Sequence, residues 1–489
     1  MIVRLRAWVA RVLLSVSVVF SSSAFAEERT QRFDADAHWE SINSRAVSPE
    51  PRTIRQDFGY SHTARAGGAM GEIGGLITPA AEPAYYAKPI PAAGLREKLS
   101  ASGTFACADG GFHVLVGFFN SHTLNEWRTP NTIALRLVGR GPMFFAYVEY
   151  CTGRWRAGGD DPRSFATVPD PATGRPQFKG FAAQGTVHRW SLSYDPAGAD
   201  GRGAIVATMD DETAVCHLAE GHRADGATFD RFGLVNVMKS ADSGGELWLD
   251  DITVGEEQED FTADPGWDEL NNRRQYVTAL VRPRFDFGFS PTNFAGGQKP
   301  GELGGVIFRG DCRYPDRLAA YADGVDELTL DKPLRASGKV ALRRGVSDSA
   351  VLIGFFNSRQ SLAVSQAQDY GLPTGFFGIS TDAPSREGFY FAPAYRLPGD
   401  VRDHAANRGP PRIYPDGAAH DWTFVYTPTS DGAGQISVTL DQQQVLLPVP
   451  RAARASAARF DRFGLLTTWI DGNSQTIYFD DLAYTCRQQ

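Results

Sequence analysis

Three glutamates are the first candidates for chemistry. Glu72 and Glu302 each lie in a Gly-Glu-x-Gly-Gly sequence, and Glu149 lies in the alternating run Phe-Ala-Tyr-Val-Glu-Tyr. Cleavage of a glycosidic bond normally uses two carboxyl groups, roughly 5–10 Å apart, across the bond. We therefore predict acid/base roles for Glu72, Glu149 and Glu302. The structural alternative for the two glycine-flanked residues is a carboxylate that accepts backbone N–H groups in a turn.

Aromatic, basic and amide side chains accompany Glu149. Alternation along a strand places Phe145, Tyr147 and Glu149 on one face. Aromatic rings stack on the apolar faces of sugars, and charged or amide groups bind their hydroxyls. The predicted substrate-binding residues are Asn120, Trp127, Arg128, Tyr147, Arg154, Trp155, Asn357 and Arg309. The alternative is an ordinary strand with one face in water, as antiparallel sheets often have.

The elements that position these residues occur twice. A leading block, Phe33 to Arg45, matches Phe261 to Arg273 at an offset of 228, and Gly117-Phe-Phe-Asn-Ser121 matches Gly354-Phe-Phe-Asn-Ser358. Four further blocks match in the same order. A period this long indicates duplicated domains, not a solenoid of small repeats. We predict a first copy over 27–256 and a second over 257–489.

The two copies differ at the predicted acidic face. Aligning 145–150 with 390–395 sets Ala394 against Glu149. The second copy instead carries a charged stretch that begins at Arg309. Divergence after duplication often separates roles, so one copy is expected to act on the ligand while the other binds or buttresses. The sequence leaves open which copy acts and whether the site lies between them.

Each copy reads as β structure. Short runs rich in aromatic and branched residues, such as 113–119, 133–138 and 144–150, are separated by Gly-, Pro- and Asp-rich turns. Long amphipathic helices are absent from the sequence pattern. Many short strands joined by turns are typical of a β-sandwich.

Three features resemble the concanavalin A-like lectin/glucanase (laminin-G-like) jelly-roll superfamily. They are the His188–Asp195 run followed by a turn and 205–210, its echo in 420–426 and 436–441, and a closing strand that ends in Asp-Asp-Ile or Asp-Asp-Leu. The resemblance implies an all-β fold of two tandem jelly-roll β-sandwich domains. It also implies a carbohydrate as the partner. No Glu-x-Asp-x-x-Glu catalytic strand is present, and no specific family is matched.

Composition and the N-terminus narrow the setting. A formal charge of −8, with 49 basic and 57 acidic residues, argues against nucleic acid. Residues 1–26 combine arginines, an apolar run and a small-residue stretch before Glu27, as a signal peptide does. We expect export to the periplasm or beyond and no membrane span. The oligomeric state is left open.

Metal chemistry has little support. The sequence contains no Cys-x-x-Cys spacing that would predict a zinc site, and no cofactor is expected. Adjacent carboxylates at Asp250–Asp251 and Asp480–Asp481 leave calcium as an alternative, because calcium prefers oxygen ligands.

Three functions therefore compete. The first is a glycoside hydrolase that acts on a polysaccharide or oligosaccharide through paired carboxylates. The second is a polysaccharide lyase on the same fold, with a Tyr or His base and an Arg that neutralises a uronate. The third is a non-catalytic, lectin-like protein. Release of reducing sugar would indicate an enzyme, and binding without turnover would indicate the lectin-like protein.

Overall fold

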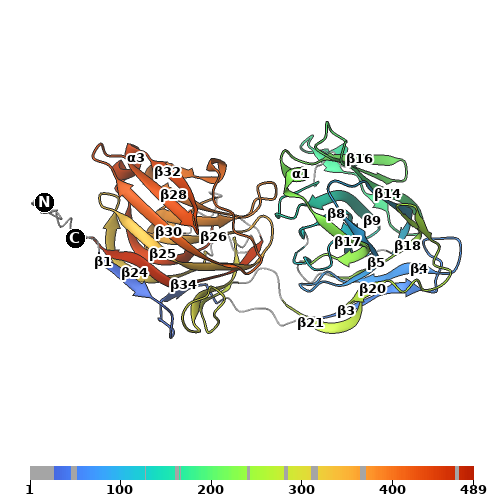
Figure 1. The fold of residues 1–489 in the computed structure, drawn as a ribbon, viewed down its shortest axis with the longest axis horizontal. Helices are drawn as coiled ribbons and strands as arrows, with labels where there is room; N and C mark the ends of the chain where they lie inside the picture. The colour runs from blue at the N-terminus through green and yellow to red at the C-terminus, as the bar shows by residue number, and fades with distance from the viewer. Residues whose placement is uncertain are drawn as a thin grey trace, which may run out of the picture.

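The computed structural model describes residues 27–45, 52–108, 110–126, 128–159, 165, 167–238, 243–279, 285–309, 318–363, 371–468 and 473–488. Two β-sandwiches lie side by side along the long axis of the molecule (Figure 1). The predicted signal peptide at 1–26 falls outside the described residues. No helix in the described ranges is long and apolar enough to cross a membrane.

The first sandwich is built from two antiparallel sheets. One sheet has the order β21 (Arg273–Thr278), β3 (Arg52–Ser61), β4 (Glu72–Ile77), β18 (Gly245–Val254), β6 (Leu99–Cys107), β14 (His188–Asp195), β15 (Ala204–Met209), β16 (Glu212–His217), with β19 (Glu257–Glu259) paired to β18. The other has the order β20 (Asp268–Leu270), β5 (Tyr85–Gly94), β17 (Thr228–Asn236), β7 (His113–Phe119), β8 (Thr132–Arg140), β9 (Met143–Cys151), β10 (Ala157–Gly158), with β13 (Phe181–Ala182) paired to β9. A hairpin of β11 (Thr167–Pro169) and β12 (Pro176–Phe178) and a short helix, α1 (His222–Asp225), complete it.

The second sandwich repeats this order. One sheet is β22 (Asp286–Ser290), β23 (Glu302–Phe308), β34 (Ser474–Arg487), β25 (Leu334–Gly345), β30 (Ala419–Pro428), β31 (Gly434–Leu440), β32 (Gln443–Val449), with β1 (Glu27–Gln31) paired to β34. The other is β2 (Glu40–Ile42), β24 (Ala320–Thr329), β33 (Arg459–Leu466), β26 (Ala350–Phe356), β27 (Phe376–Asp382), β28 (Tyr390–Leu397), β29 (Val401–His404). Short helical turns are α2 (Ser358–Ser361), η2 (Pro398–Asp400), η3 (Ala406–Arg408) and α3 (Arg451–Ala455).

Each sandwich encloses its own apolar core between its two sheets. The largest buried side chains are aromatic, Trp422 and Tyr426 in the second sandwich and Tyr194 and Phe105 in the first. Alternating apolar residues on the strands supply these cores, because successive side chains point to opposite faces. The predicted all-β fold of two tandem jelly-roll sandwiches is confirmed.

The start of each copy pairs with the sandwich that is formed mainly by the other copy. Strands β1 and β2, from the start of the first copy, pair with β34 and β24 of the second sandwich. Strands β19, β20 and β21, from the start of the second copy, pair with strands of the first sandwich. The repeat boundaries at 256 and 257 stay a prediction about the sequence, and the hydrogen-bonded sheets divide the chain differently.

The two leading blocks make equivalent contacts. Trp39 packs against the rings of Tyr321 and Tyr484, with centroids 6.0 Å apart in both cases, and Trp267 stacks on Tyr86 at 5.7 Å. The backbone of each block also touches a glycine of a Gly-Glu-x-Gly-Gly sequence. Each leading block is therefore an integral part of the sandwich it covers.

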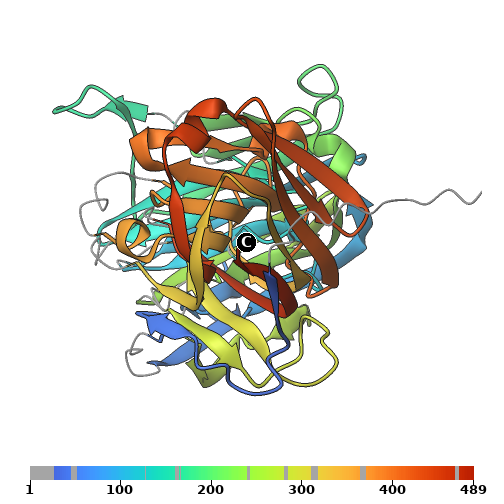
Figure 2. The same ribbon diagram turned by 90° about the vertical axis from the view of Figure 1, so that its left-hand side faces the viewer.

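Strand β1 closes the second sandwich where a hairpin closes the first. In the first sandwich, a tight turn at 255–256 joins β18 to β19. In the second, Glu27 of β1 lies opposite Arg487 of β34, with a side-chain ion pair of 3.1 Å between them. Figure 2 shows the blue N-terminal strand beside the red C-terminal one. Residues 460 positions apart thus complete one sheet.

Candidate functional site

A groove of about 500 Å³ lies on the outer face of the β26–β29 part of the second sandwich. Its floor is made of small side chains, Ala350, Ala392, Ala394 and Ser380, on neighbouring strands. Small residues at these positions leave the sheet surface low. Charged and aromatic residues stand around that floor, as in most ligand sites.

The strand register shows why this groove belongs to the second sandwich. Gly378 and Ala394 are opposed on β27 and β28, and the equivalent pair on β8 and β9 is Ala134 and Glu149. The predicted alignment of Ala394 with Glu149 therefore agrees with the sheet register. The same face of the sheet carries different side chains in the two sandwiches.

In the first sandwich an ion pair fills this face. Glu149 is bonded to Arg136, and both side chains are almost fully buried. The Arg136 guanidinium lies 4.2 Å from the ring centre of Tyr147, and its Nη1 is 3.4 Å from His113 Nε2. In the second sandwich Ser380 occupies the position of Arg136. Loss of these large groups opens the groove.

A carboxyl–phenol pair marks one wall of the groove. The hydroxyl of Tyr390 donates to Asp382 Oδ2 at 3.1 Å, and the N–H of Ala383 donates to Oδ1 at 2.8 Å. Burial raises the pKa of Asp382, while the hydrogen bond from the Ala383 N–H and the positive charge of Arg309 act in the opposite direction. Burial, and then the neighbouring Asp382, raises the pKa of Tyr390. The phenol therefore keeps its proton in the resting site and donates it in a hydrogen bond to the carboxyl group of Asp382.

Arg309 is held at the groove by its backbone. It directly follows β23, where its N–H donates to Asn473 O at 3.0 Å and its carbonyl accepts from the N–H of Thr468 at 2.9 Å. The side chain lines the groove together with that of Asp382. A guanidinium at this place is suited to hold a ligand carboxylate.

The edge strand β29 supplies the rim. His404 Nδ1 accepts the N–H of Ala406 at 3.3 Å, so a neutral ring carries its proton on Nε2. Arg402 pairs with Asp400 at 3.5 Å and is half exposed. The groove thus offers a buried acid, a phenol, an imidazole and two guanidinium groups.

Of the predicted site residues that the structure describes, only Arg309 lines this groove. Glu72 and Glu302 are fully buried at the starts of β4 and β23. Each accepts bonds from a threonine hydroxyl and from two backbone N–H groups of the preceding loop. This is the structural arrangement that the sequence left as the alternative for them.

Arg128 and Trp155 lie where the two sandwiches meet. The Arg128 guanidinium bonds to Ser385 of the second sandwich, and Trp155 stacks on Tyr414 with ring centroids 5.8 Å apart. Buried Glu126 nearby accepts the N–H of Ser347 at 3.0 Å, and its burial raises its pKa to about 8. These residues hold the sandwiches together.

Three further predicted residues, Asn120, Arg154 and Asn357, lie outside the strands. Asn120 donates to Thr228 Oγ1 at 3.0 Å, and Asn357 caps helix α2 by accepting two backbone N–H groups. Arg154 is exposed beside β9. Trp127 lies outside the described residues. None of these four predictions is tested by the contacts.

The acidic pairs proposed for calcium are arranged alike in the two sandwiches. The carboxylate of Asp250 accepts the N–H of Asp251 at 2.7 Å, and Asp480 does the same with Asp481. Within the described part of the chain, no three His, Cys, Asp or Glu side chains gather as metal ligands.

Sequence reasoning missed Asp382, Tyr390 and His404. The available signal was the contrast between the copies. Tyr390 stands where the first copy has Phe145, in the very alignment that drew attention to Glu149. Attention to what the second copy gained at this face, as well as to what it lost, would have found the groove.

Comparison with known proteins gives a distant likeness only. Neither a family model nor a curated protein matches the chain. Among solved structures, domains LG4-5 of the mouse laminin alpha1 chain match at 11% identity and a TM-score of 0.22, over 88% of this chain and 92% of that one. An endo-beta-1,4-glucuronan lyase from the fungus Trichoderma reesei matches at 16% identity and a TM-score of 0.28, over 42% and 90%. An alginate lyase matches at 13% identity and a TM-score of 0.25, over 39% and 82%. At these TM-scores the likeness carries no functional conclusion.

Proposed function

We propose that the groove of the second sandwich binds an acidic polysaccharide and cleaves it by β-elimination, outside the cytoplasm. The observation that supports this is the position of Arg309, Asp382, Tyr390 and His404 around one small-residue floor. A uronate carboxylate matches the guanidinium groups, and the Asp–Tyr pair supplies acid/base groups.

The reaction needs no added reagent. The proton on C5 of the uronate leaves, a C4=C5 double bond forms, the C4–O4 bond breaks, and the departing O4 takes up a proton. Arg309 holds the carboxylate and stabilises the charge that develops at C5. Tyr390 takes the C5 proton while its own proton passes to Asp382, whose raised pKa favours holding it. A proton then passes from the Tyr390–Asp382 pair to O4, to which the Nε2–H of His404 donates a hydrogen bond, so that both groups end in their starting protonation states.

Hydrolysis is the second candidate. It requires two carboxylates across the bond. Asp382 and Asp403 both line the groove, but Asp403 lies 3.7 Å from Arg408, so one carboxylate has a competing partner. Glu149, Glu72 and Glu302 each have internal partners. A lectin-like role needs only the groove.

The experiment incubates the chain from Glu27 with a panel of uronate-containing and neutral polysaccharides. β-Elimination gives products with the ultraviolet absorbance of an unsaturated uronate, while hydrolysis gives reducing ends without it. Tyr390→Phe and Asp382→Asn should lower the rate about 10²- to 10⁴-fold. Tyr86→Phe, which removes a similar Tyr–Asp hydrogen bond of 3.0 Å far from the groove, is the matched control.

Each result has a defined meaning. Unsaturated products that are lost in the groove variants, and retained in Tyr86→Phe, support the proposal. Reducing ends without unsaturation favour the hydrolase, and binding without any product favours the lectin-like role. Equal activity in Tyr390→Phe, Asp382→Asn and the unmodified chain would remove this groove from consideration.

A further inference from the structure

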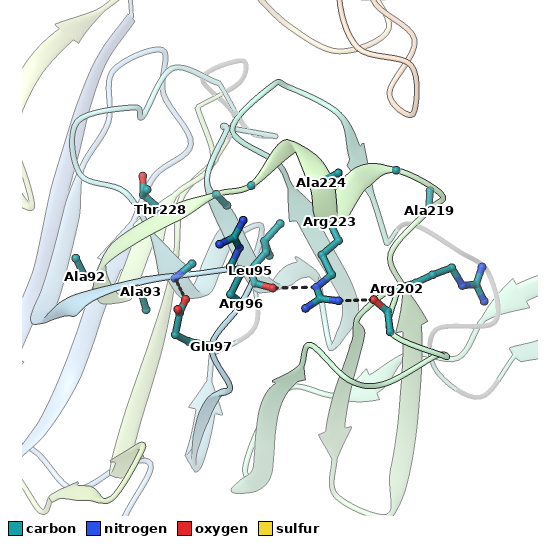
Figure 3. A pocket seen from close by; sticks show the side chains of 15 residues that line it. Ala92, Ala93, Leu95, Arg96, Glu97, Arg202, Ala219, Arg223, Ala224 and Thr228 are labelled. Atoms are coloured by element: carbon teal, nitrogen blue, oxygen red, sulfur yellow. Dashed lines mark hydrogen bonds between the residues drawn. The ribbon is translucent and has the colours of Figure 1, made fainter.

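A second cavity, of about 750 Å³, lies on the first sandwich between the turn after β5 and helix α1. Figure 3 shows this pocket with Arg96, Arg202 and Arg223 among its labelled side chains. Its other lining is mostly alanine and glycine. In a chain of net charge −8, three arginines around one hollow are a local concentration of positive charge.

Two backbone carbonyls hold Arg223 in place. Its Nη1 donates to Gly201 O at 2.6 Å, and its Nε lies 3.4 Å from Leu95 O. Within the described residues, no carboxylate lies within ion-pair distance of it. Among the described residues that line the pocket, Glu97 alone is acidic, and it accepts the N–H of Gly94 at 2.8 Å. The guanidinium is therefore fixed without a neutralising partner.

In the second sandwich, the arginine equivalent to Arg223 is neutralised by a carboxylate. Tyr194 donates to Leu95 O and Tyr426 donates to Leu330 O, so these two carbonyls are equivalent. The next residue is Arg96 in the first sandwich and Asp331 in the second. Arg454 of α3, which takes the place of Arg223, bonds to Asp331 Oδ1 at 3.0 Å. The first sandwich thus has a second cation where its twin has a counter-ion.

We propose that this pocket, the Arg96–Arg223 pocket, is a separate binding site for the carboxylate groups of an acidic oligosaccharide. Guanidinium groups that line one pocket repel each other, and a bound anion lowers that cost. The volume is far larger than a single ion needs and falls within the range of small-molecule sites. The choice of a uronate as the anionic group rests on the function proposed above.

Titration calorimetry with tetragalacturonate tests this inference. Arg96→Asp introduces the residue of the second sandwich and should pair with Arg223, as Asp331 does with Arg454. Affinity at this site should fall about tenfold to a hundredfold. Lys98→Asp, the same charge change two positions along on an exposed residue outside the pocket, is the control. Neutral cellotetraose and inorganic sulfate serve as comparison ligands.

Arg309→Ala separates this inference from the proposed function. Two binding events in the unmodified chain, one lost in Arg96→Asp and the other in Arg309→Ala, support both. One event that only Arg96→Asp removes supports the pocket and not the groove. Unchanged binding in Arg96→Asp, or equal loss in Lys98→Asp, would overturn the pocket. Sulfate that binds as tightly as tetragalacturonate would overturn the assignment to a saccharide.

Discussion

Replacement of Trp39 by alanine should destabilise the second sandwich, although Trp39 belongs to the first copy in sequence. Its indole is 8% exposed and lies among Phe33, Tyr321 and Tyr484 in the core of the second sandwich. Loss of this ring leaves a cavity that the strands of a rigid sheet cannot collapse to fill.

The size of the effect follows from this burial. Replacement of a buried tryptophan by alanine costs about 3–5 kcal/mol in unfolding free energy. In a domain of about 200 residues, 1 kcal/mol corresponds to roughly 2–4 °C in melting temperature. The second sandwich should therefore melt roughly 6–20 °C lower, while the first should be unaffected directly.

Hydrogen exchange read by mass spectrometry locates the loss. In Trp39→Ala, amides of β24 and β34 should exchange faster, because those strands pair with β2 and β1. The matched variant is Trp267→Ala, whose ring is 5% exposed in the first sandwich and which should loosen β5 and β18 instead. If Trp39→Ala loosened the first sandwich, or left both unchanged, the assignment of each leading block to the sandwich of the other copy would be refuted.

Three further outcomes are expected. Glu149→Gln breaks a buried ion pair and should lower the unfolding free energy by about 3–5 kcal/mol in a denaturant titration. An unchanged midpoint would contradict the burial of the Arg136–Glu149 pair on this face of the first sandwich. Gly301→Ala would set a Cβ 1.9 Å from Phe33 O at φ +128°, so it should cost at least about 1 kcal/mol, whereas Gly324→Ala, with open space around it, should melt almost normally. Burial raises the pKa of Asp480 to about 7, so the folded chain binds this proton more tightly than the unfolded chain does, and stability should fall as the pH rises from about 4 to 7. Asp480→Asn should flatten that slope in melting curves taken across the range, and a slope as steep as before would show that other groups cause it.

The sequence predicted the fold well because its signals are local. Alternation gave the strands, and six matching blocks gave the duplication. The partners of each leading block could not be predicted in this way. Phe33-to-Arg45 and Phe261-to-Arg273 match each other, but a match says nothing about which sheet edge each one covers. That depends on pairing between residues hundreds of positions apart.

The site was harder to predict than the fold, because acidic residues that recur in a duplicated chain serve two purposes. Glu72 and Glu302 are equivalent residues. Each sandwich has one of them because it needs a carboxylate to bind the N–H groups of one loop. A position kept alike in both copies thus pointed to structure. Arg309, chosen because the second copy differs there, lies in the groove.

The groove and the pocket both lie where the two sandwiches differ in side chains. On the outer sheet face, the first sandwich carries the Arg136–Glu149 pair, and the second has Ser380 and Ala394 and therefore a groove. At the short helix the relation is reversed. The second sandwich pairs Arg454 with Asp331, and the first has Arg96 and therefore a charged pocket. In each case one sandwich keeps an internal ion pair where its twin lacks the counter-charge or the whole pair. Because the fold around both positions is the same, we attribute each difference to the altered side chains, and we propose that an external ligand takes the place of the lost internal partner.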